Sequence, residues 1–480
     1  MVELTIIGYC LFGTLLGGLL CLIPSLHIYN VTGIAILIYL KFRTVVPEYA
    51  LVPFFMSMMV AFAFLNTIPM TFFSAADESA GATILPSMDM LKNGKGKDAS
   101  LLSGMGTLLG AFILLFMTPF FYKVCTYIYS ISRFHLHWII GLILVHYVMS
   151  EWPRGAGRGR KPWDKMKNGY SNIFAGLLTF TLASIVGLIL TTKPLAPAEL
   201  SFQNIMPIFV GFFAFPSILQ AMLSKAKYPT TQYDSKYINA GWGDFGYASL
   251  PGIIGGLMTA LIPAVTIGIA AISASHMTNH RNLRQTSFEK PLEDGTVVHI
   301  HTPEIYYIQE RIFLIAGGIN KIIYYVGAFL LLYVLTELTP NGMGRGGMNI
   351  MLKPISTPQP GDYYIMMGTI LFSSGISMLM LLWATRLTVK HFKFLTDNLR
   401  AIYAVITVFL VAVVYLMGGG LYNVQGGLMA LLVAAVTTCI GSIPVFFNCR
   451  RSHCMAVLLV PIAANMAGYG DAIAKWLWLI

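Results

Sequence analysis

The chain has 480 residues, of which 56% are hydrophobic and only 11% are charged. Its mean hydropathy of +0.71 exceeds that of a water-soluble domain of this length. The net charge of +11 is spread over short loops between apolar runs, which argues against a nucleic-acid-binding face. We therefore expect a multi-pass protein of the cell (cytoplasmic) membrane, with the lipid bilayer as a partner and no nucleic acid.

Twelve apolar runs are long enough to be membrane helices, since a bilayer core needs about 20 residues per span. They cover residues 4–24, 49–69, 101–122, 134–149, 171–192, 205–223, 247–275, 319–338, 363–384, 401–417, 424–443 and 454–470. The period-two alternation of membrane barrels is absent. We predict an all-α integral membrane protein with about 10–12 transmembrane or re-entrant helices.

The first span is interrupted. The stretch "GTLLGGLLCLIPSLHIYN", residues 13–30, runs through glycine and leucine to Pro24, and then presents Ser25, His27 and Asn30. Proline cannot donate a backbone hydrogen bond and clashes with the preceding turn, so we predict a helix break near Pro24. Backbone groups freed at membrane depth are tolerated where protein or a water-filled cavity satisfies them.

The same spacing returns half a chain later. Gly13, Gly17 and Pro24 are repeated as Gly252, Gly256 and Pro263, each pair 239 residues apart (252 − 13, 256 − 17, 263 − 24). Corresponding breaks in two halves of a membrane protein are typical of a transporter binding site. A pair of proline-kinked packing helices is the alternative explanation, and both stay open at this point.

Charge placement favours two halves of opposite orientation. The basic loops 154–167, 386–400 and 448–454 should share the cytoplasmic side, and they do so if 247–275 enters, breaks near Pro263 and returns. The same reading of residues 4–40 gives two inverted repeats. We therefore predict an N-terminal membrane repeat, 1–240, and a C-terminal one, 241–480, with a hydrophilic hairpin insert at about 281–310 around the Asp294-Gly295 turn.

The stretch from residue 66 to residue 100 places Asp77, Glu78 and Ser79 together, directly after an apolar span. Carboxylates close to hydrocarbon are costly and tend to face a cavity, bind an ion or relay a proton. An ordinary cytoplasmic loop is the alternative, but the small residues around the acids favour a site for a coupling ion, Na+ or H+.

Arg450 and Arg451 lie between two spans, where they would attract an anion or anchor the topology of a tight cytoplasmic turn. His276 with His280, and His299 with His301, have spacings that a zinc site could use, but surface histidines on a loop are the commoner outcome. Cys449, His453 and Cys454 also suggest a metal site, but no second C-x-x-C or His pair lies beside them. We therefore expect no metal site and no cofactor.

Three stretches together resemble the large membrane subunit of tripartite tricarboxylate transporters, in its archaeal-type branch. They are "GTLLGGLLCLIPSLHIYNVTGIAI", "PMTFFSAADESAGATILPSMDMLKNGKGKDA" and "GSIPVFFNCRRSHCMAVLLVP", and "PGIIGGLMTALIPAVTIGIAAI" is the second-half counterpart of the first. His27 and Asn30 match the archaeal branch, whereas Ser25 replaces the glycine that usually follows the first proline. The resemblance implies a permease that moves carboxylate anions with an ion gradient, assisted in bacteria by a small membrane subunit and an extracytoplasmic binding protein.

These observations lead to the hypothesis of a cation-coupled secondary transporter for a small organic anion, and not an enzyme. Its substrate site would comprise Ser25, His27, Asn30, Thr32, Pro263 and Thr266. An accessory membrane subunit, a binding protein and a homodimer are partners left open. The competing hypotheses are a membrane-embedded enzyme or accessory protein acting on a lipid or a lipid-anchored protein, with His27, Asp77 and Glu78 as acid-base groups, and a structural subunit of a larger complex.

Overall fold

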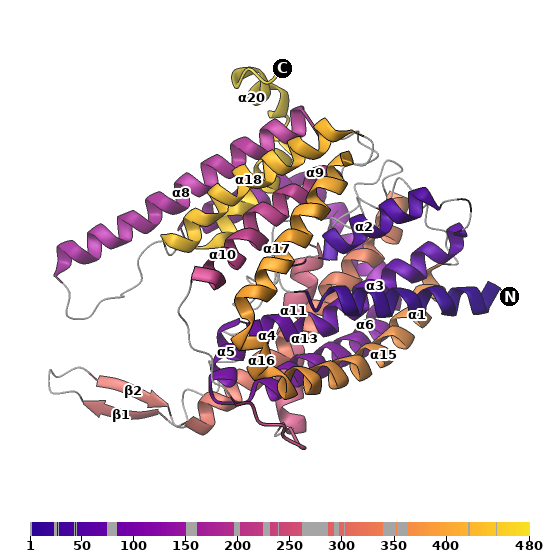
Figure 1. Cartoon of the computed structure of the whole chain (residues 1–480), viewed down its shortest axis with the longest axis vertical. Helices are drawn as coiled ribbons and strands as arrows, with labels where there is room; N and C mark the ends of the chain where they lie inside the picture. The colour runs from indigo at the N-terminus through magenta and orange to yellow at the C-terminus, as the bar shows by residue number, and fades with distance from the viewer. Residues whose placement is uncertain are drawn as a thin grey trace.

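The computed structural model of the chain is a bundle of helices (Figure 1). It describes residues 2–23, 26, 28–42, 44, 46–73, 84–149, 161–195, 202–223, 231–238, 240–261, 287–291, 297–301, 303–338, 352, 362–420, 423–447 and 449–480. The elements of the first half are α1 (Val2–Leu20), α2 (Ile28–Lys41), η1 (Glu48–Ala50), α3 (Leu51–Leu65), α4 (Thr67–Phe73), α5 (Ile84–Lys92), α6 (Gly96–Ser132), η3 (Arg133–His135), α7 (Leu136–Met149), α8 (Pro162–Thr192), α9 (Phe202–Phe209), η5 (Val210–Ala214) and α10 (Phe215–Leu223). Those of the second half are α11 (Trp242–Leu261), β1 (Ser287–Pro291), β2 (Val297–His301), α13 (Pro303–Leu338), α15 (Asp362–Lys390), α16 (Phe392–Asp397), α17 (Leu399–Tyr415), η6 (Leu416–Gly420), α18 (Val424–Phe446), η7 (Arg451–Met455), α19 (Ala456–Met466) and α20 (Gly470–Trp476).

The prediction of an all-α integral membrane protein is confirmed. Within the described ranges, nine helices are long and apolar enough to cross a membrane, and a pair bent by 116°, Arg451–Met466 with Gly470–Trp476, would make ten. The strands β1 and β2 are the exception to the helical fold. They pair antiparallel with Ser287 opposite His301, on either side of the predicted Asp294-Gly295 turn.

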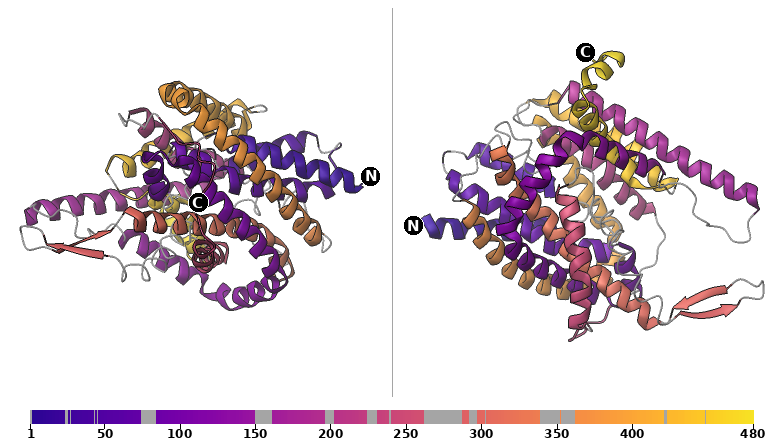
Figure 2. Two further views of the ribbon diagram at one scale, coloured as in Figure 1. Left: turned by 90° about the horizontal axis from the view of Figure 1, so that it is seen from below. Right: turned by 180° about the vertical axis from the view of Figure 1, so that it is seen from behind.

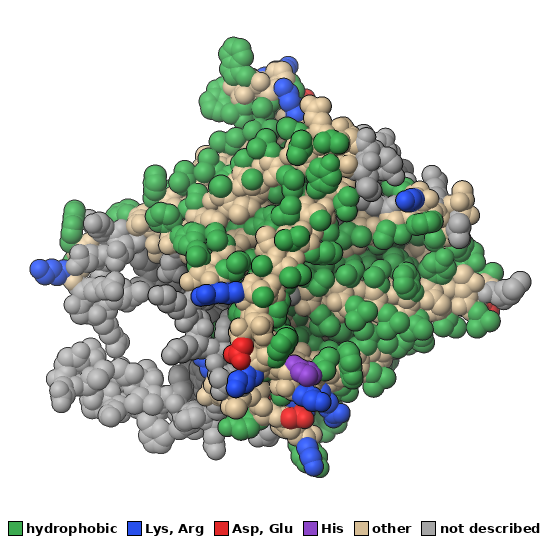
Figure 3. All heavy atoms as spheres, viewed as in Figure 1, with side chains coloured by type: hydrophobic (Ala, Val, Ile, Leu, Met, Phe, Trp, Pro, Cys, Tyr) green, Lys and Arg blue, Asp and Glu red, His purple; other side chains and the backbone are tan. Residues whose placement is uncertain are grey.

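Two helices form the centre of the bundle. All residues of α3 are buried, and so is most of the span of α13 from Gln309 to Leu330. The surrounding helices turn leucine, valine and phenylalanine outward, so that hydrophobic side chains cover most of the face in Figure 3. A helix that is apolar on every side belongs in the core of a large membrane protein, whereas the outer helices present their apolar faces to lipid.

The helices α1 and α3 pack closely and run in the same direction. The glycine pair of α1 lies on this contact, because a Cβ atom on Gly13 would collide with Phe54, and one on Gly17 would lie 2.7 Å from the carbonyl oxygen of Met58. Contacts that advance by four residues along both helices mean that the two are parallel. The chain must therefore cross back between α1 and α3, which is the course predicted for residues 4–40.

The second half repeats this contact. A Cβ atom on Gly252 of α11 would lie 2.7 Å from Cβ of Ile319, and one on Gly256 would lie 2.6 Å from Cβ of Ile323, so α11 and α13 are also parallel. The side chains of Asp244 and Arg311, near the starts of these helices, form an ion pair with Nε 3.4 Å from Oδ2.

We call α1 with α3 the first unit and α11 with α13 the second unit. The helices of the two units run in opposite directions. The helix α6 begins where α3 and α4 end, because a Cβ atom on Gly96 would lie 2.9 Å from the ring of Phe72. It then runs parallel to α13. A Cβ atom on Gly106 would lie 2.8 Å from Cα of Ile315, and one on Gly110 would lie 2.8 Å from Cα of Ile319. Because α6 returns from the far end of α3, the pair α11 and α13 is antiparallel to the pair α1 and α3.

Further along the chain, two more close glycine contacts join helices of the first half to helices of the second half. In α8, Gly187 would bring a Cβ atom to 2.8 Å from the carbonyl carbon of Val457 near the start of α19, and in α18, Gly441 would bring one to 2.8 Å from Cα of Phe212 in η5. In the first of these contacts, a glycine of α8 in the first half packs against α19 in the second half. In the other, a glycine of α18 in the second half packs against η5 in the first half. Seen from two other sides, the outer end of α8 and the β1–β2 hairpin project on the same side of the bundle (Figure 2).

Candidate functional site

The break predicted near Pro24 is confirmed. The regular hydrogen bonds of α1 end at Leu20, the amide of Cys21 still bonds the carbonyl of Gly17 at 3.0 Å, and the amide of Ile23 makes a tighter bond to Leu20 at 3.1 Å. The helix α2 then starts at Ile28. Pro24, Ser25 and His27 themselves lie outside the described residues, as does the side chain of Asn30, whose backbone belongs to the first turn of α2.

In the second half, α11 extends to Leu261, two residues before Pro263. Pro263 and Thr266 lie outside the described residues, and so do Asp77, Glu78 and Ser79 between α4 and α5. Of the predicted substrate site, the structure describes the side chain of Thr32. Its hydroxyl is buried and donates a 2.9 Å hydrogen bond to the carbonyl oxygen of Ile28, one turn earlier in α2.

The two arginines have different surroundings. Arg450 is exposed, whereas the guanidinium of Arg451 donates to Oγ of Ser217 and to Oε1 of Gln220, both at 2.5 Å. Both acceptors belong to α10, so Arg451 fastens η7 to the end of that helix. Among the described residues, no three His, Cys, Asp or Glu side chains are grouped so as to hold a metal ion.

The structure places a polar pair in the middle of α13 that the hydropathy pattern did not single out. Asn320 and Lys321 are each 1% exposed and lie near the centre of the span Gln309–Leu330. A lysine at the centre of a membrane helix costs about 3 kcal/mol by membrane-insertion measurements, so such residues usually have a function. Lys321 also lies within electrostatic range of Cys21, at the break of α1.

The sequence contains a pattern that indicates the central position of Lys321. The predicted span began at Ile319, which made Lys321 a flanking residue of the kind that anchors a helix end. The apolar run "IFLIAGGI", residues 312–319, precedes it directly and belongs to the same helix. Joining the two runs moves Lys321 from the rim of a span to its middle.

A polar seam joins α1, α3 and α15 inside the bundle. The hydroxyl of Thr14 lies 2.9 Å from Oγ of Ser373, which in turn donates to the carbonyl oxygen of Ser57 at 3.0 Å. All three residues are fully buried. Within the membrane such hydroxyls hold helices together, and here they connect residues of the two halves of the chain.

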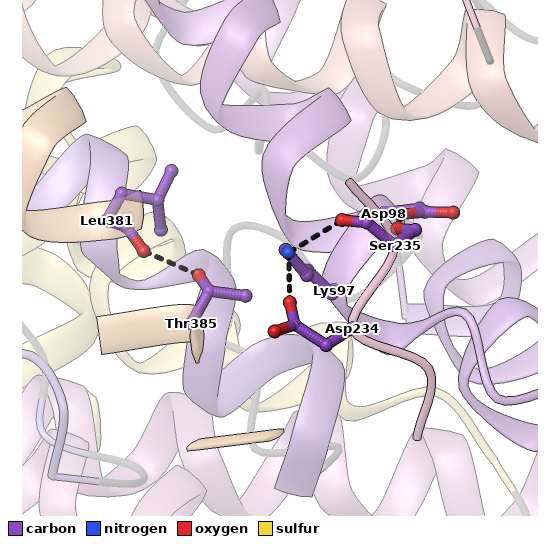
Figure 4. Close-up of polar contacts among 6 residues, drawn as sticks. All are labelled: Lys97, Asp98, Asp234, Ser235, Leu381 and Thr385. Carbon is purple, nitrogen blue, oxygen red and sulfur yellow. Dashed lines mark hydrogen bonds and ion pairs between the residues drawn. The ribbon is translucent and has the colours of Figure 1, made fainter. Parts of the chain in front are cut away.

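At the end of the bundle where α6 begins, an extended segment crosses the junction of α5 and α6. Lys97 donates to the carboxylate of Asp234 and, at 2.7 Å, to the carbonyl oxygen of Ser235, whose hydroxyl donates to Asp98 (Figure 4). The ammonium of Lys97 lowers the pKa of the Asp234 carboxyl, because its hydrogen bond favours the charged form. The backbone amide of Tyr233 also donates to the carbonyl oxygen of Gly94, at 2.8 Å.

Comparison with known proteins gives a family and a distant relative. Residues 7–456 match the model of the tripartite tricarboxylate transporter TctA family. An uncharacterised protein of Methanocaldococcus jannaschii is 22% identical over 214 residues, which are 44% of this chain and 47% of the relative, so the match spans about half the length of that protein. No solved structure matches the chain. Since the family model covers nearly all of the residues, including both glycine motifs and the segment of Asp77, the chain belongs to the tripartite tricarboxylate transporter TctA family.

Proposed function

We propose that this protein is the permease for a small organic anion of the carboxylate class, driven by a cation gradient. The observation that carries the proposal is the pair of antiparallel units, α1 with α3 and α11 with α13, in which α1 breaks after Leu20 and α11 is described up to Leu261, two residues before Pro263. Interrupted helices offer the partial charges of their ends to a substrate and a coupling ion. Family membership supports a transport role.

We infer that the two units belong to inverted repeats, residues 1–240 and 241–480. In this proposal α1, α3 and α6 correspond to α11, α13 and α15. The packing supports it, because α3 contacts α15 as α13 contacts α6, and α1 contacts α15 as α11 contacts α6. Such a relation lets one site open alternately to the two faces of a membrane.

In the proposed site, Ser25, His27, Asn30 and Thr32 of the first unit, and Pro263 and Thr266 of the second, bind the anion. Hydroxyl, amide and backbone N–H groups are the donors that a carboxylate requires. Asp77, Glu78 and Ser79 hold Na+ or relay H+. The name of the family adds an accessory membrane subunit and an extracytoplasmic binding protein as proposed partners.

The test is ligand-dependent thermal unfolding of the purified protein, with carboxylates, phosphates and lipid headgroups, with and without sodium and at two pH values. A ligand at 100 times its Kd raises the free energy of unfolding by about 2.7 kcal/mol, even where turnover is not measured. We expect stabilisation by a small carboxylate, increased by sodium or by protons, and lost in Asn30→Ala and in Asp77→Ala.

Uptake of the stabilising carboxylate into proteoliposomes then tests transport itself. Uptake by the chain alone would show that the accessory partners are dispensable, and uptake only with added partners would show the contrary. No response to any small anion, together with stabilisation by a lipid headgroup, would refute the permease and favour an enzyme or accessory protein acting on lipid.

A further inference from the structure

Lys321 does not belong to the predicted site. Among the buried lysine, arginine and acidic residues that the structure describes, its exposed fraction is the smallest. It is 1% exposed, and it lies 12 residues after the first and nine before the last residue of the span Gln309–Leu330. Burying an ammonium group in a membrane protein is costly, and an apolar side chain would pack there without that cost. Packing alone therefore does not explain a lysine at this position.

The neighbours of α13 fix the direction in which Lys321 points. Ile319 and Ile323 pack on the glycine pair of α11, and Gly318 and Ile322 pack on α6. Tyr325, one turn after Lys321 and on the same face, packs its ring on that of Phe62 in α3, with 5.6 Å between centroids. Lys321 thus faces α3 and the end of α1, and not α11.

This direction leads to the first broken helix. Lys321 lies within electrostatic range of Cys21, the residue that follows the last turn of α1 and whose thiol donates to the carbonyl oxygen of Gly18. Phe62 of α3 contacts Tyr325 of α13, and the two helices are antiparallel. Moving one turn back along α13, from Tyr325 to Lys321, therefore corresponds to moving one turn forward along α3 from Phe62. The residue reached in this way is Asn66, which is 5% exposed and separates α3 from α4. The buried Asn66 therefore lies at the level of Lys321, and the helical hydrogen bonds continue through it, from its amide to Phe62 and from the amide of Met70 to its carbonyl oxygen.

The corresponding position in the first half carries no charge. The carbonyl oxygens of Phe54 and Met58 face the first glycine pair as those of Ala316 and Asn320 face the second, an offset of 262 residues at both positions (316 − 54, 320 − 58). The same offset places Met59 opposite Lys321, and Met59 is buried. A methionine of similar length fills this position in one unit, so the positive charge belongs to one side of the bundle only.

We propose that Lys321 is the cationic contact of the substrate site and holds a carboxylate group of the transported anion beside the break of α1. The assignment rests on the proposed permease function and adds to it the residue that balances the charge of the substrate. An ammonium group has three donors, so bonds to the protein leave room for a ligand oxygen. A site with this residue favours anions over their neutral analogues, because a carboxylate accepts a charge-assisted hydrogen bond from the ammonium that a neutral ligand cannot match.

The experiment compares Lys321→Met with the purified wild-type protein in calorimetric titrations with acetate, succinate and citrate. Lys97→Met is the matched control, since it removes another buried lysine at the end of the bundle, away from the break of α1. We expect the affinity for the best-bound carboxylate to fall at least tenfold in Lys321→Met, to stay within about threefold in Lys97→Met, and to be retained in part by Lys321→Arg.

The outcomes separate the two proposals. Binding to the wild-type protein that is unchanged in Lys321→Met overturns the role of Lys321 and leaves the permease intact, whereas no binding or uptake of any carboxylate by the wild type overturns the permease. If Lys321→Met is not monodisperse, Lys321→Gln replaces it. Failure of both neutral variants to fold, while Lys321→Arg folds, assigns the lysine to the structure of the core and overturns its role in binding.

Discussion

Most of the buried threonines that the structure describes donate their hydroxyl hydrogen bond within their own helix. The hydroxyls of Thr32, Thr107 and Thr259 each donate to the carbonyl oxygen four residues earlier, at 2.8–2.9 Å. This local bond lets a small polar residue enter a membrane helix at little cost. It also means that the donor of Thr32 is already engaged, so in the proposed site Thr32 would contribute less to binding an anion than the amide of Asn30. A lysine has no such local solution, which is why Lys321 indicates function more strongly than any threonine.

At the same scale, the ion pair of Lys97 and Asp234 predicts a small stability effect that depends on pH. The folded state lowers the pKa of the Asp234 carboxyl from its ordinary value of 3.8. The contribution is therefore fully present above that value and is lost as the pH falls through the lowered pKa. Because the Asp234 side chain is 62% exposed, we expect a coupling of about 1 kcal/mol or less.

A double-mutant cycle with Lys97→Met and Asp234→Asn checks this effect by thermal unfolding at pH 7 and at a pH well below 3.8, where the Asp234 carboxyl becomes protonated. The coupling should be measurable at pH 7 and shrink in acid. An equal coupling at both pH values would show that the two residues interact by packing and not through the charge of Asp234.

Among the elements, the glycines of α1 make the packing of the first unit testable. A methyl group on Gly13 would collide with Phe54, whereas nothing lies within 4 Å of the same position on Gly8 in the same helix. We expect Gly13→Ala to lower the free energy of unfolding by about 1–3 kcal/mol through overpacking. Gly8→Ala should leave it unchanged or raise it by up to about 1 kcal/mol, because alanine is the better helix former.

Chemical or thermal unfolding in detergent measures both variants, and the Gly8 variant is the control for helix propensity. Equal stabilities would contradict the close contact of α1 with α3. A loss in Gly13→Ala that is rescued by Ser57→Gly, which removes the hydroxyl beside the same position, would locate the strain at this contact.

The elements also show how far the sequence predicts the fold. Apolar runs and the spacing of glycines and prolines predict the spans and the break of α1, because span length and helix termination are local properties. The polar first turns of α8 and α13 were missed, since charged residues interrupt the hydropathy pattern without ending the helix. The contact of Thr14 with Ser373 could not be predicted, because it depends on the packing of helices 359 residues apart. For the candidate site, sequence spacing identified the broken helix but not Lys321, whose importance depends on how the two units meet.

On the scale of the whole molecule, the directions of the helices predict the sidedness of the protein. The helices α1 and α15 are parallel, since Thr14 meets Ser373 and Gly18 meets Met380 further along both. The start of α1 and the end of α15 therefore lie on opposite faces. By the positive-inside rule, the exposed basic residues at and after the end of α15, including Lys390, Lys393 and Arg400, predict that this end faces the cytoplasm.

Single cysteines at Glu3 and Lys393, in a chain whose six cysteines have been replaced, test this arrangement. A membrane-impermeant thiol reagent should label Lys393→Cys in inside-out vesicles and Glu3→Cys in right-side-out vesicles, and the cysteine-free chain should remain unlabelled. Labelling of both positions from one face would contradict the parallel course of α1 and α15.

The polar seam between α1, α3 and α15 has a consequence for the order in which the protein is made. Ser57 leaves the ribosome more than 300 residues before Ser373. In the finished protein, the hydroxyl of Ser373 donates a hydrogen bond to the carbonyl oxygen of Ser57. Until α15 is inserted, α3 lacks one of the helices that enclose it, and the Thr14 hydroxyl lacks its partner across the seam. The N-terminal half therefore completes its fold after synthesis of most of the C-terminal half, so assembly in the membrane is a joint event of both halves.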